Sequence, residues 1–207
     1  KNSILEAIAR PAEKTKPWYE YRKIFVTDSR ANKGMDFYRE YADSLQRAER
    51  QFGVPAEIIT AIIGVETLYG RNKGRYRVID ALSTLAFDYE PRAPFFRSEL
   101  KHFLLMTREQ GLPVDKLKGS YAGAMGYGQF IPSSYRHYAV DYDGDGRRDL
   151  WGSPADIIGS VGNYLKEHGW TLGTTVAARA GVSGDAWRAV AEQGLKPHTS
   201  VDALRQK

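Results

Sequence analysis

Apolar residues recur at spacings of three and four along most of this chain, and glycines or prolines interrupt the recurrence where helices commonly end. From Asp36 to Phe52 the recurring residues follow one face of a helix, and Gly53 stands where a C-terminal cap is expected. The segment 171–207 lacks this pattern and mixes β-branched residues with glycine and proline. The predicted fold class is therefore mainly α with minor β. Further helices are expected just before Pro11, from Pro55 to before Gly70, from near Asp80, from Pro94 to Gln110, after Pro132 and from Pro154 to His168.

The chain has 207 residues, of which 42% are apolar, and this is enough for one large domain with its own core. It contains no cysteine, which excludes disulfide scaffolds, cysteine-ligated zinc sites and thiol nucleophiles. The most apolar run, Ile58 to Val65, is only eight residues long, so no membrane span is predicted. Because the first residue is Lys1 and no signal-like region follows it, we expect a processed chain.

The charge balance is mildly basic, with 30 basic and 25 acidic residues and a net charge of +5. This excess fits a solvated surface without an anionic partner, and it also fits a polyanionic partner such as nucleic acid or an acidic polysaccharide. The 13 tyrosines and four tryptophans have flat apolar rings with a polar edge, which stack on sugars or bases but also pack protein cores. Charge and aromatic content therefore leave the partner open.

Glu66 lies at the end of an apolar helical pattern. Ile59 and Ile63 precede it by seven and three residues, which at about 100° per residue places Glu66 on the apolar stripe. A carboxyl on such a stripe loses hydration, and desolvation raises its pKa toward that of a general acid. The alternative is a buried glutamate paired with an arginine such as Arg71 or Arg77. The pattern of this helix alone favours neither interpretation.

A glycine-rich segment, residues 119–132, carries little helical pattern. Four glycines within ten residues allow the backbone to approach a ligand closely, and Ser120, Tyr127 and Gln129 supply hydrogen-bonding groups. The segment fits neither the dinucleotide fingerprint nor the Walker loop, because their glycine frames are absent. A binding loop and a tight structural turn both remain open.

Residues 141–149 read Asp-Tyr-Asp-Gly-Asp-Gly-Arg-Arg-Asp, which places carboxylates at positions 1, 3, 5 and 9 and glycine at position 6 of an EF-hand loop. Carboxylates this crowded repel one another without a cation, so a calcium site is predicted, with an empty acidic turn as the alternative. Position 12, where a bidentate glutamate is expected, is Gly152, and the next carboxylate is Asp156. The last ligand is therefore left open.

Other metal and nucleophile chemistries have no support in the sequence. The four histidines are far apart and lack the spacing of zinc ligands. A Gly-x-Ser-x-Gly motif is absent, so no serine triad is predicted. The histidines are His102, His137, His168 and His198.

Three motifs together resemble one family: Gly64-Val65-Glu66-Thr67, the block from Ser120 to Tyr135 that begins Ser-Tyr-Ala-Gly-Ala-Met-Gly-Tyr-Gly-Gln-Phe, and the Asp-rich loop. Over about residues 21–170 the chain is similar to the bacterial lytic murein transglycosylases of the membrane-bound type B group, including their soluble forms. The resemblance implies a lysozyme-like core, a flanking helical domain and an EF-hand-like calcium loop. It implies three domains with these boundaries: an N-terminal α domain at 1–54, the core at 55–170 with its calcium loop at 141–156, and the start of a small, incomplete β-containing domain at 171–207.

The resemblance also assigns roles to individual residues. Glu66 matches the single catalytic acid and base of the family. Phe95 stands where relatives can carry a tyrosine, so a hydroxyl contact is not expected there. The family's late Tyr-Asn segment, which returns to the cleft, is absent from these 207 residues. The implied substrate-cleft residues are Tyr21, Phe95, Ser120, Tyr127, Gln129, Phe130 and Tyr164. The candidate calcium ligands are Asp141, Asp143, Asp145, the backbone of Arg147, Asp149 and a late aspartate aligned with Asp156.

Such an enzyme cleaves the bond between N-acetylmuramic acid and N-acetylglucosamine without adding water, and leaves 1,6-anhydromuramyl ends. Ordinary glycosidases use two carboxylates, but one suffices when the substrate supplies its own nucleophiles, the 2-acetamido carbonyl and then the C6 hydroxyl. A hydrolytic muramidase and a non-catalytic glycan-binding fragment are the alternatives. The resemblance further implies peptidoglycan strands and other cell-wall enzymes as partners, structural calcium without an organic cofactor, no nucleic acid, a soluble monomer and a periplasmic location.

Overall fold

The computed structural model describes residues 1–9, 16–193 and 198–206, and this part of the chain is mostly helical with one small sheet. The chain divides into two compact units, residues 1–172 and 173–207, and the first contains every predicted site residue. Among the described residues, no helix combines the length and the apolar character needed to cross a bilayer. The elements are α1 (Asn2–Ala9), α2 (Trp18–Phe25), α3 (Asp28–Glu40), α4 (Ala42–Phe52), α5 (Ala56–Thr67), β1 (Tyr76–Arg77), α6 (Val78–Asp88), the 3₁₀ helix η2 (Glu90–Arg92), α7 (Ala93–Gln110), β2 (Lys118–Gly119), α8 (Pro132–Tyr138), α9 (Pro154–Glu167), α10 (Ala186–Ala191) and α11 (Val201–Arg205).

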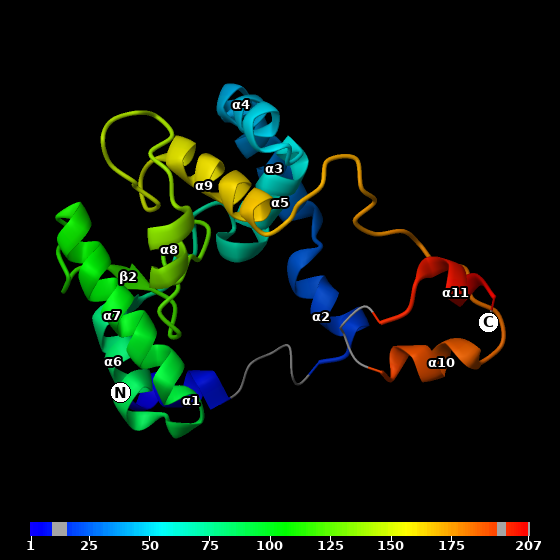
Figure 1. Ribbon diagram of the computed structural model, residues 1–207, viewed down its shortest axis with the longest axis horizontal. Coiled ribbons are helices and arrows are strands. Elements are labelled where there is room, and N and C mark those ends of the chain that lie inside the picture. Colours follow the sequence, from blue (N-terminus) through cyan, green and yellow to red (C-terminus); the bar gives the residue numbers. More distant parts are fainter. Residues whose placement is uncertain (10–15, 194–197, 207) are drawn as a thin grey trace. The chain divides into compact units, whose positions relative to one another are not determined.

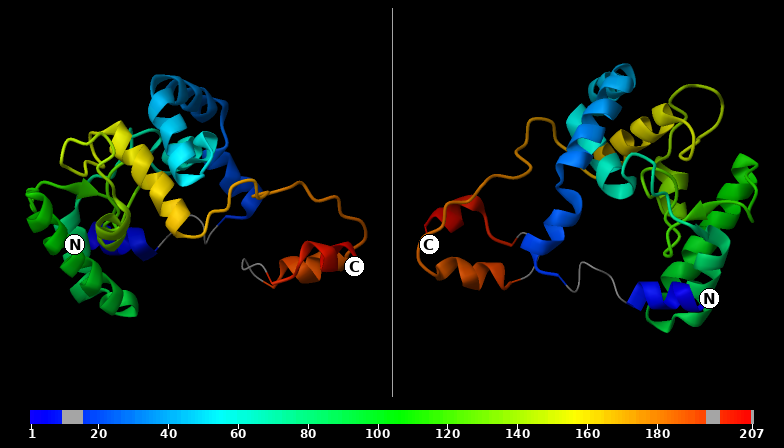
Figure 2. Two further views of the ribbon diagram at one scale, coloured as in Figure 1. Left: turned by 45° about the horizontal axis from the view of Figure 1, so that its top comes forward. Right: turned by 180° about the vertical axis from the view of Figure 1, so that it is seen from behind.

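Helix α5 lies among α3, α4 and α9, and Figure 2 shows these four helices together in both views. Ile59 and Ile63 on one face are fully buried and Ile58 and Ile62 on the adjacent face are partly buried against the core, which explains why its sequence is apolar on more than one face. Close approach of α9 depends on Gly162, where a Cβ atom would lie 2.7 Å from the ring of Phe52 in α4. This packing fixes the direction of α5, which carries Glu66 in its last turn.

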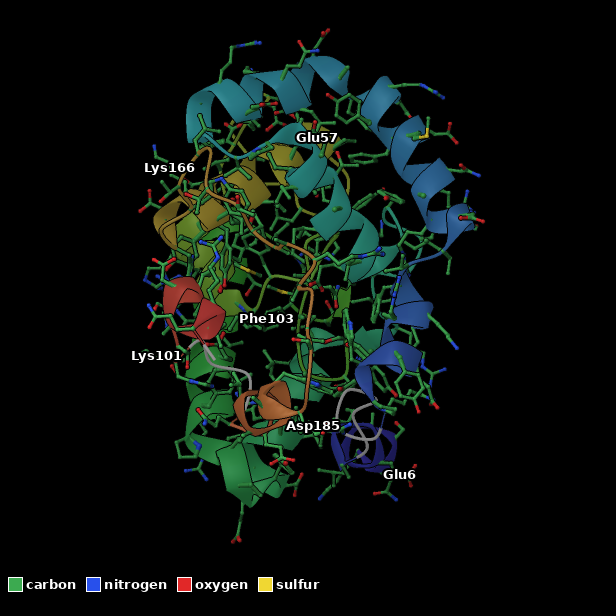
Figure 3. All side chains as sticks on the ribbon, turned by 90° about the vertical axis from the view of Figure 1, so that its right-hand side faces the viewer. Glu6, Glu57, Lys101, Phe103, Lys166 and Asp185 are labelled. Atoms are coloured by element: carbon green, nitrogen blue, oxygen red, sulfur yellow. The ribbon has the colours of Figure 1, made fainter. Side chains whose placement is uncertain are left out.

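Helices α6 and α7 pack along one another, with α1 against α6 and α8 against α7 (Figure 1). On α7, Phe103 is fully buried and Lys101 is exposed; both are labelled in Figure 3. The buried Glu99 accepts a hydrogen bond from the backbone N–H of Ser133 at 2.9 Å, which holds the first turn of α8 against α7. Gly111 ends α7 with φ 62°, and so confirms the predicted cap.

The single helix predicted from Asp36 to Phe52 is wrong, because α3 and α4 meet at Tyr41. This residue has φ −113° and ψ 26°, which is outside the helical range. The chain turns there because the two helices have different main partners, α5 for α3 and α9 for α4. Phe37 and Leu45 are buried on either side of the turn, so the apolar spacing continues through it.

Strands β1 and β2 pair antiparallel, with Tyr76 opposite Gly119 and Arg77 opposite Lys118. Strand β1 follows the turn after α5, and β2 leads into the glycine-rich segment. At Gly74, with φ 89°, an added Cβ atom would collide with the backbone of Gly119. The sheet therefore brings the end of α5 and the glycine-rich segment close together.

Of the other predictions about helix ends, one is confirmed and one is wrong. Gly53 has φ 69° and confirms its predicted cap, whereas Pro55 precedes α5 as its N-cap instead of opening it. Helix α2 was not predicted from the polar, proline-interrupted N-terminal sequence. Residues 1–172 form one compact unit, and the expected boundary at 54/55 stays a prediction. The described part of 173–207 contains helices α10 and α11, and the observed strands are β1 and β2. The start of a small β-containing domain at 171–207 stays a prediction.

Candidate active site

A cavity of about 310 Å³ opens between the last turn of α5, the glycine-rich segment, α8 and α9. It brings together the predicted catalytic residue Glu66 and three of the seven predicted substrate-cleft residues, Gln129, Phe130 and Tyr164. These come from three segments that are far apart in sequence, so only the tertiary fold assembles the site. The remaining lining residues are Ile62, Gly128, Ile131, Ser134, Val161 and Leu165.

The Glu66 carboxyl is unpaired and lies in this cavity. Within the described residues it makes no hydrogen bond or ion pair, and Arg77, one of its two candidate partners, instead pairs with Asp80 at 2.6 Å. The residue is open to solvent on the cavity side, unlike the buried Ile59 and Ile63 of the same helix. Desolvation by the surrounding protein nevertheless raises the pKa of Glu66. The helix therefore ends in a carboxyl whose pKa is raised by desolvation and which is still open to a ligand.

The chain makes a strained turn directly after α5. Leu68, Tyr69 and Gly70 have φ values of 51°, 57° and 79°, and the left-handed region is uncommon for the first two residue types. The Tyr69 ring is held between α3 and α5, where a Cβ atom on Gly34 would lie 2.5 Å from its Oη. Strained backbone of this kind persists where packing over-determines it, and it concentrates at functional sites. Here it begins two residues after Glu66.

The glycine-rich segment reverses sharply between Met125 and Phe130, which exchange backbone hydrogen bonds of 2.9 and 3.0 Å. Gln129 sits in this reversal with φ 48°, and its Nε2 donates to the carbonyl of Gly126 at 3.0 Å. One end of the Gln129 amide is thus held by its own loop. The reversal directs both Gln129 and Phe130 to the cavity, which favours the binding-loop interpretation over a turn without a ligand.

Aromatic rings form the wall contributed by α9. The ring of Tyr164 meets the edge of Phe130 at a centroid distance of 5.5 Å and that of Tyr138 at 5.3 Å. His168 stacks on Tyr164 at 4.0 Å, and its Nδ1 lies 2.7 Å from the Tyr164 carbonyl oxygen. A ring fixed from three sides is a suitable surface for the face of a sugar.

The other four predicted cleft residues do not line this cavity. The Ser120 Oγ accepts hydrogen bonds from the backbone N–H groups of Ala122 and Ala124, at 3.2 and 3.0 Å. The Tyr127 ring packs against Gly70, with the Lys73 ammonium 4.6 Å from its centroid. Tyr21 is half-buried on α2, with its ring 5.2 Å from that of Phe25. Phe95 is 36% exposed on α7, beneath the Arg92 guanidinium at 4.4 Å.

The Asp-rich loop lies between α8 and α9 and projects as an open loop in Figure 1. Oxygens of Asp141, Asp143 and Asp145 lie within 4.8 Å of one another, and all three residues are exposed. The Asp141 carboxylate accepts backbone N–H groups from Gly144, Asp145 and Gly146, so the loop curls around it. Gly146 has φ 89°, as the sharp turn at position 6 of an EF-hand requires.

The two later aspartates of the loop are engaged by backbone groups. Asp149 accepts from the N–H groups of Trp151 and Gly152 at 2.8 and 2.9 Å. Asp156 is fully buried at the start of α9; its Oδ1 accepts from Tyr142 at 2.6 Å and its Oδ2 from Asp149 at 2.7 Å. The structure therefore gives Asp156 the position of an anchor that closes the loop, outside the cluster of three exposed carboxylates.

The sequence matches the family described as the transglycosylase SLT domain over residues 1–207. The chain belongs to this family. It is 51% identical over 174 residues to the membrane-bound lytic murein transglycosylase B of Escherichia coli (strain K12), an alignment that covers 84% of this chain and 48% of the relative. The chain thus spans about half the length of that curated relative.

Two solved structures of SLT-family proteins show the same fold. The soluble lytic transglycosylase SltB1 from Pseudomonas aeruginosa has a TM-score of 0.93 and 55% identity, over 100% of this chain and 69% of that one. The Escherichia coli lytic transglycosylase Slt35 in complex with calcium has a TM-score of 0.78 and 44% identity, over 97% of this chain and 67% of that one. These likenesses confirm the predicted family and its lysozyme-like fold.

Sequence reasoning missed several residues that line the cleft of this SLT domain. Val161 and Leu165 lie three residues before and one residue after Tyr164, so the helical spacing of α9 could have found Val161 on the same face. Ile62 precedes Glu66 by one helical turn, so the spacing of α5 could have found it beside Glu66. Ser134 carries no local signal, because its place depends on how α8 packs against α7.

Proposed function

We propose that this SLT domain cleaves peptidoglycan strands as a lytic transglycosylase and forms 1,6-anhydromuramyl ends. One observation carries the proposal: among the described residues that line the cavity, Glu66 is the only carboxylate. A two-carboxylate glycosidase would place a second acid about 5–10 Å across the scissile bond. The names of the relatives, which are lytic transglycosylases of murein, support the same reaction class.

In this mechanism Glu66 starts as a neutral acid, which its raised pKa favours. It donates its proton to the glycosidic oxygen, and the C1–O bond breaks while the 2-acetamido carbonyl oxygen of the muramyl residue bonds to C1. The Glu66 carboxylate then accepts the C6 hydroxyl proton. The C6 oxygen bonds to C1 and displaces the acetamido oxygen, so Glu66 is neutral again and no water is consumed.

The cavity walls would hold the sugar in place for this chemistry. Tyr164, backed by the largely buried ring of Phe130, presents aromatic surface to a sugar face, and the Gln129 amide offers hydrogen bonds beside Glu66. Tyr21, Phe95, Ser120 and Tyr127 remain proposed contacts along a longer strand, supported by the family resemblance. The net charge of +5 suits a glycan that bears lactyl and peptide carboxylates.

The Asp-rich loop is the proposed site of a structural calcium ion. Hard carboxylate oxygens within reach of one another and the left-handed Gly146 fit calcium, and the relative Slt35 has a structure in complex with calcium. Asp141, Asp143 and Asp145 would hold the ion, with the Arg147 carbonyl and the carboxylates of Asp149 and Asp156 as the remaining proposed ligands. When bound, the ion neutralises the crowded carboxylates and takes no part in catalysis.

The setting proposed for this enzyme is the bacterial cell envelope, in the periplasm. It is proposed to act there as a monomer, with other cell-wall enzymes as partners.

Digestion of purified peptidoglycan by the wild type and by Glu66→Gln tests the reaction. The substitution keeps the shape of the side chain but removes its transferable proton, so turnover should fall on the order of 10²–10⁴-fold. Mass spectrometry of the wild-type products should show anhydro ends. Reducing ends, one water heavier, would identify a hydrolytic muramidase, and binding without products would identify a glycan-binding fragment. Glu66→Gln with more than a tenth of wild-type turnover would contradict the role of Glu66.

A further inference from the structure

Thr67 follows Glu66 directly, and the proposed mechanism gives it no role. Its side chain is 1% exposed at the last residue of α5. The Oγ1 atom lies 2.9 Å from the carbonyl oxygen of Tyr127 and 3.3 Å from that of Ile63, and it accepts the backbone N–H of Gly70 at 3.0 Å. One hydroxyl therefore contacts the helix, the strained turn and the glycine-rich segment.

The short contact distinguishes Thr67 from an ordinary helical threonine. A hydroxyl has one proton, and a threonine within a helix commonly donates it to the carbonyl four residues earlier. Thr60 in the same helix does this, with its Oγ1 2.8 Å from the Ala56 carbonyl. The Oγ1 atom of Thr67 lies closer to the carbonyl oxygen of Tyr127 than to that of Ile63, so its hydroxyl donates its proton to the glycine-rich segment. Among the described residues, this is the one side-chain hydrogen bond between α5 and residues 120–131.

Tyr127 is held from its other side as well, because its N–H donates to the Leu150 carbonyl at 3.0 Å. Two residues later comes Gln129, whose left-handed backbone and loop-bound amide leave its side chain little freedom. The distance between Glu66 and Gln129 therefore depends on the backbone at Thr67, next to Glu66, and at Tyr127, two residues before Gln129. The hydroxyl of Thr67 links these two segments by a hydrogen bond.

We propose that Thr67 is a positioning residue, whose hydroxyl fixes the end of α5 against the glycine-rich segment and so keeps Glu66 and Gln129 at their working separation in the cleft. This role rests on the proposed transglycosylase function. Thr67 itself does not touch the substrate. Its loss should change turnover, because a small misplacement of catalytic groups costs rate even where binding and folding persist.

The test compares Thr67→Val, Thr67→Ser and the matched control Thr60→Val. Valine keeps the shape of threonine and removes the hydroxyl, serine keeps the hydroxyl, and Thr60→Val removes a buried helical hydroxyl that does not reach the segment. Turnover per folded enzyme on peptidoglycan, KM, melting temperature and the pH profile are measured for each. We expect Thr67→Val to lower kcat on the order of 10–10²-fold. Thr67→Ser should recover most of the rate, and Thr60→Val should lower only the melting temperature.

The pH profile gives a readout that a purely structural role would not move. If Glu66 shifts away from its desolvating walls, its pKa falls, and the alkaline limb of the general-acid step moves to lower pH in Thr67→Val. A folded Thr67→Val protein whose kcat and alkaline pH limb equal those of the wild type would overturn the proposal. So would failure of both Thr67→Val and Thr67→Ala to fold while Thr60→Val folds, because Thr67 would then be a stability element. If the wild type releases no anhydro products, the proposed function fails first.

Discussion

Replacing Asp156 by asparagine separates two roles that this buried carboxylate could have, anchor of the Asp-rich loop or calcium ligand. The residue is fully buried, and its oxygens accept N–H groups from Tyr142 at 2.6 Å, Asp143 at 3.3 Å and Asp149 at 2.7 Å. Asparagine keeps one acceptor and turns the other into an NH₂ donor that faces a backbone donor. One charge-assisted bond is lost and one buried N–H becomes unsatisfied.

The expected cost follows from these contacts. An unsatisfied buried donor costs about 1–3 kcal/mol, but burial also raises the pKa of Asp156, so removing its charge offsets part of this cost; we expect Asp156→Asn to lower the free energy of unfolding by about 1–2 kcal/mol. For a unit of this size that corresponds to a melting temperature lower by roughly 2–8 °C. Because the lost bonds are to backbone, the loss should persist in the presence of a chelator.

Thermal and urea unfolding in calcium and in EDTA provide the assay. The exposed Asp143→Ala should show the opposite balance: it should lose up to about 2.7 kcal/mol of calcium stabilisation at 100 times Kd, and in EDTA only the smaller contribution of its exposed hydrogen bonds from Ser153 Oγ and the Asp145 N–H. Asp115→Asn, at another exposed aspartate, controls for the loss of one charge. A melting temperature of Asp156→Asn equal to wild type in EDTA, with a deficit only in calcium, would refute the anchor and make Asp156 a ligand.

Two further predictions concern the cleft. Desolvation by the surrounding protein raises the pKa of Glu66 above its usual 4.5, so its ionised form destabilises the folded state. Glu66→Gln should therefore melt at a higher temperature than wild type at neutral pH and lose this advantage below pH 4.5. Equal melting curves at neutral pH would contradict the desolvation of Glu66. Tyr164→Ala should raise KM or lower kcat more than it lowers the melting temperature, whereas a steep fall in stability with normal kinetics would place Tyr164 in the core.

Local chemistry in the sequence predicted much of the fold and part of the site. The helix from Pro94 to Gln110 and the caps at Gly53 and Gly111 follow from apolar spacing and from the left-handed backbone that glycine tolerates. The apolar stripe leading to Glu66 identified a carboxyl whose pKa is raised by desolvation. In each case the determining interaction lies within a few turns of one segment.

Features that depend on tertiary contacts could not be predicted in this way. The turn at Tyr41 interrupts a continuous apolar pattern because α3 and α4 have different partners. Leu68 and Tyr69 adopt positive φ although neither is glycine, in a turn held by packing of the Tyr69 ring near Gly34 and Gly64 and by the Thr67 hydroxyl. The spacing of an EF-hand left the last calcium ligand open and the family resemblance aligned it with Asp156; the backbone donors around that carboxylate are visible only in the folded loop.

The Asp-rich loop and the cleft are connected through Leu150, which limits what calcium can do to catalysis. Its carbonyl accepts the Tyr127 N–H, and Leu150 itself is 1% exposed. The neighbouring Asp149 is bound through its N–H to Asp156, so the loop segment nearest the cleft is fixed by a buried anchor. The three exposed carboxylates proposed to hold calcium, those of Asp141, Asp143 and Asp145, precede this anchored segment. An ion there should therefore stabilise the fold, while turnover of the enzyme that stays folded in EDTA should remain that of the calcium-bound form.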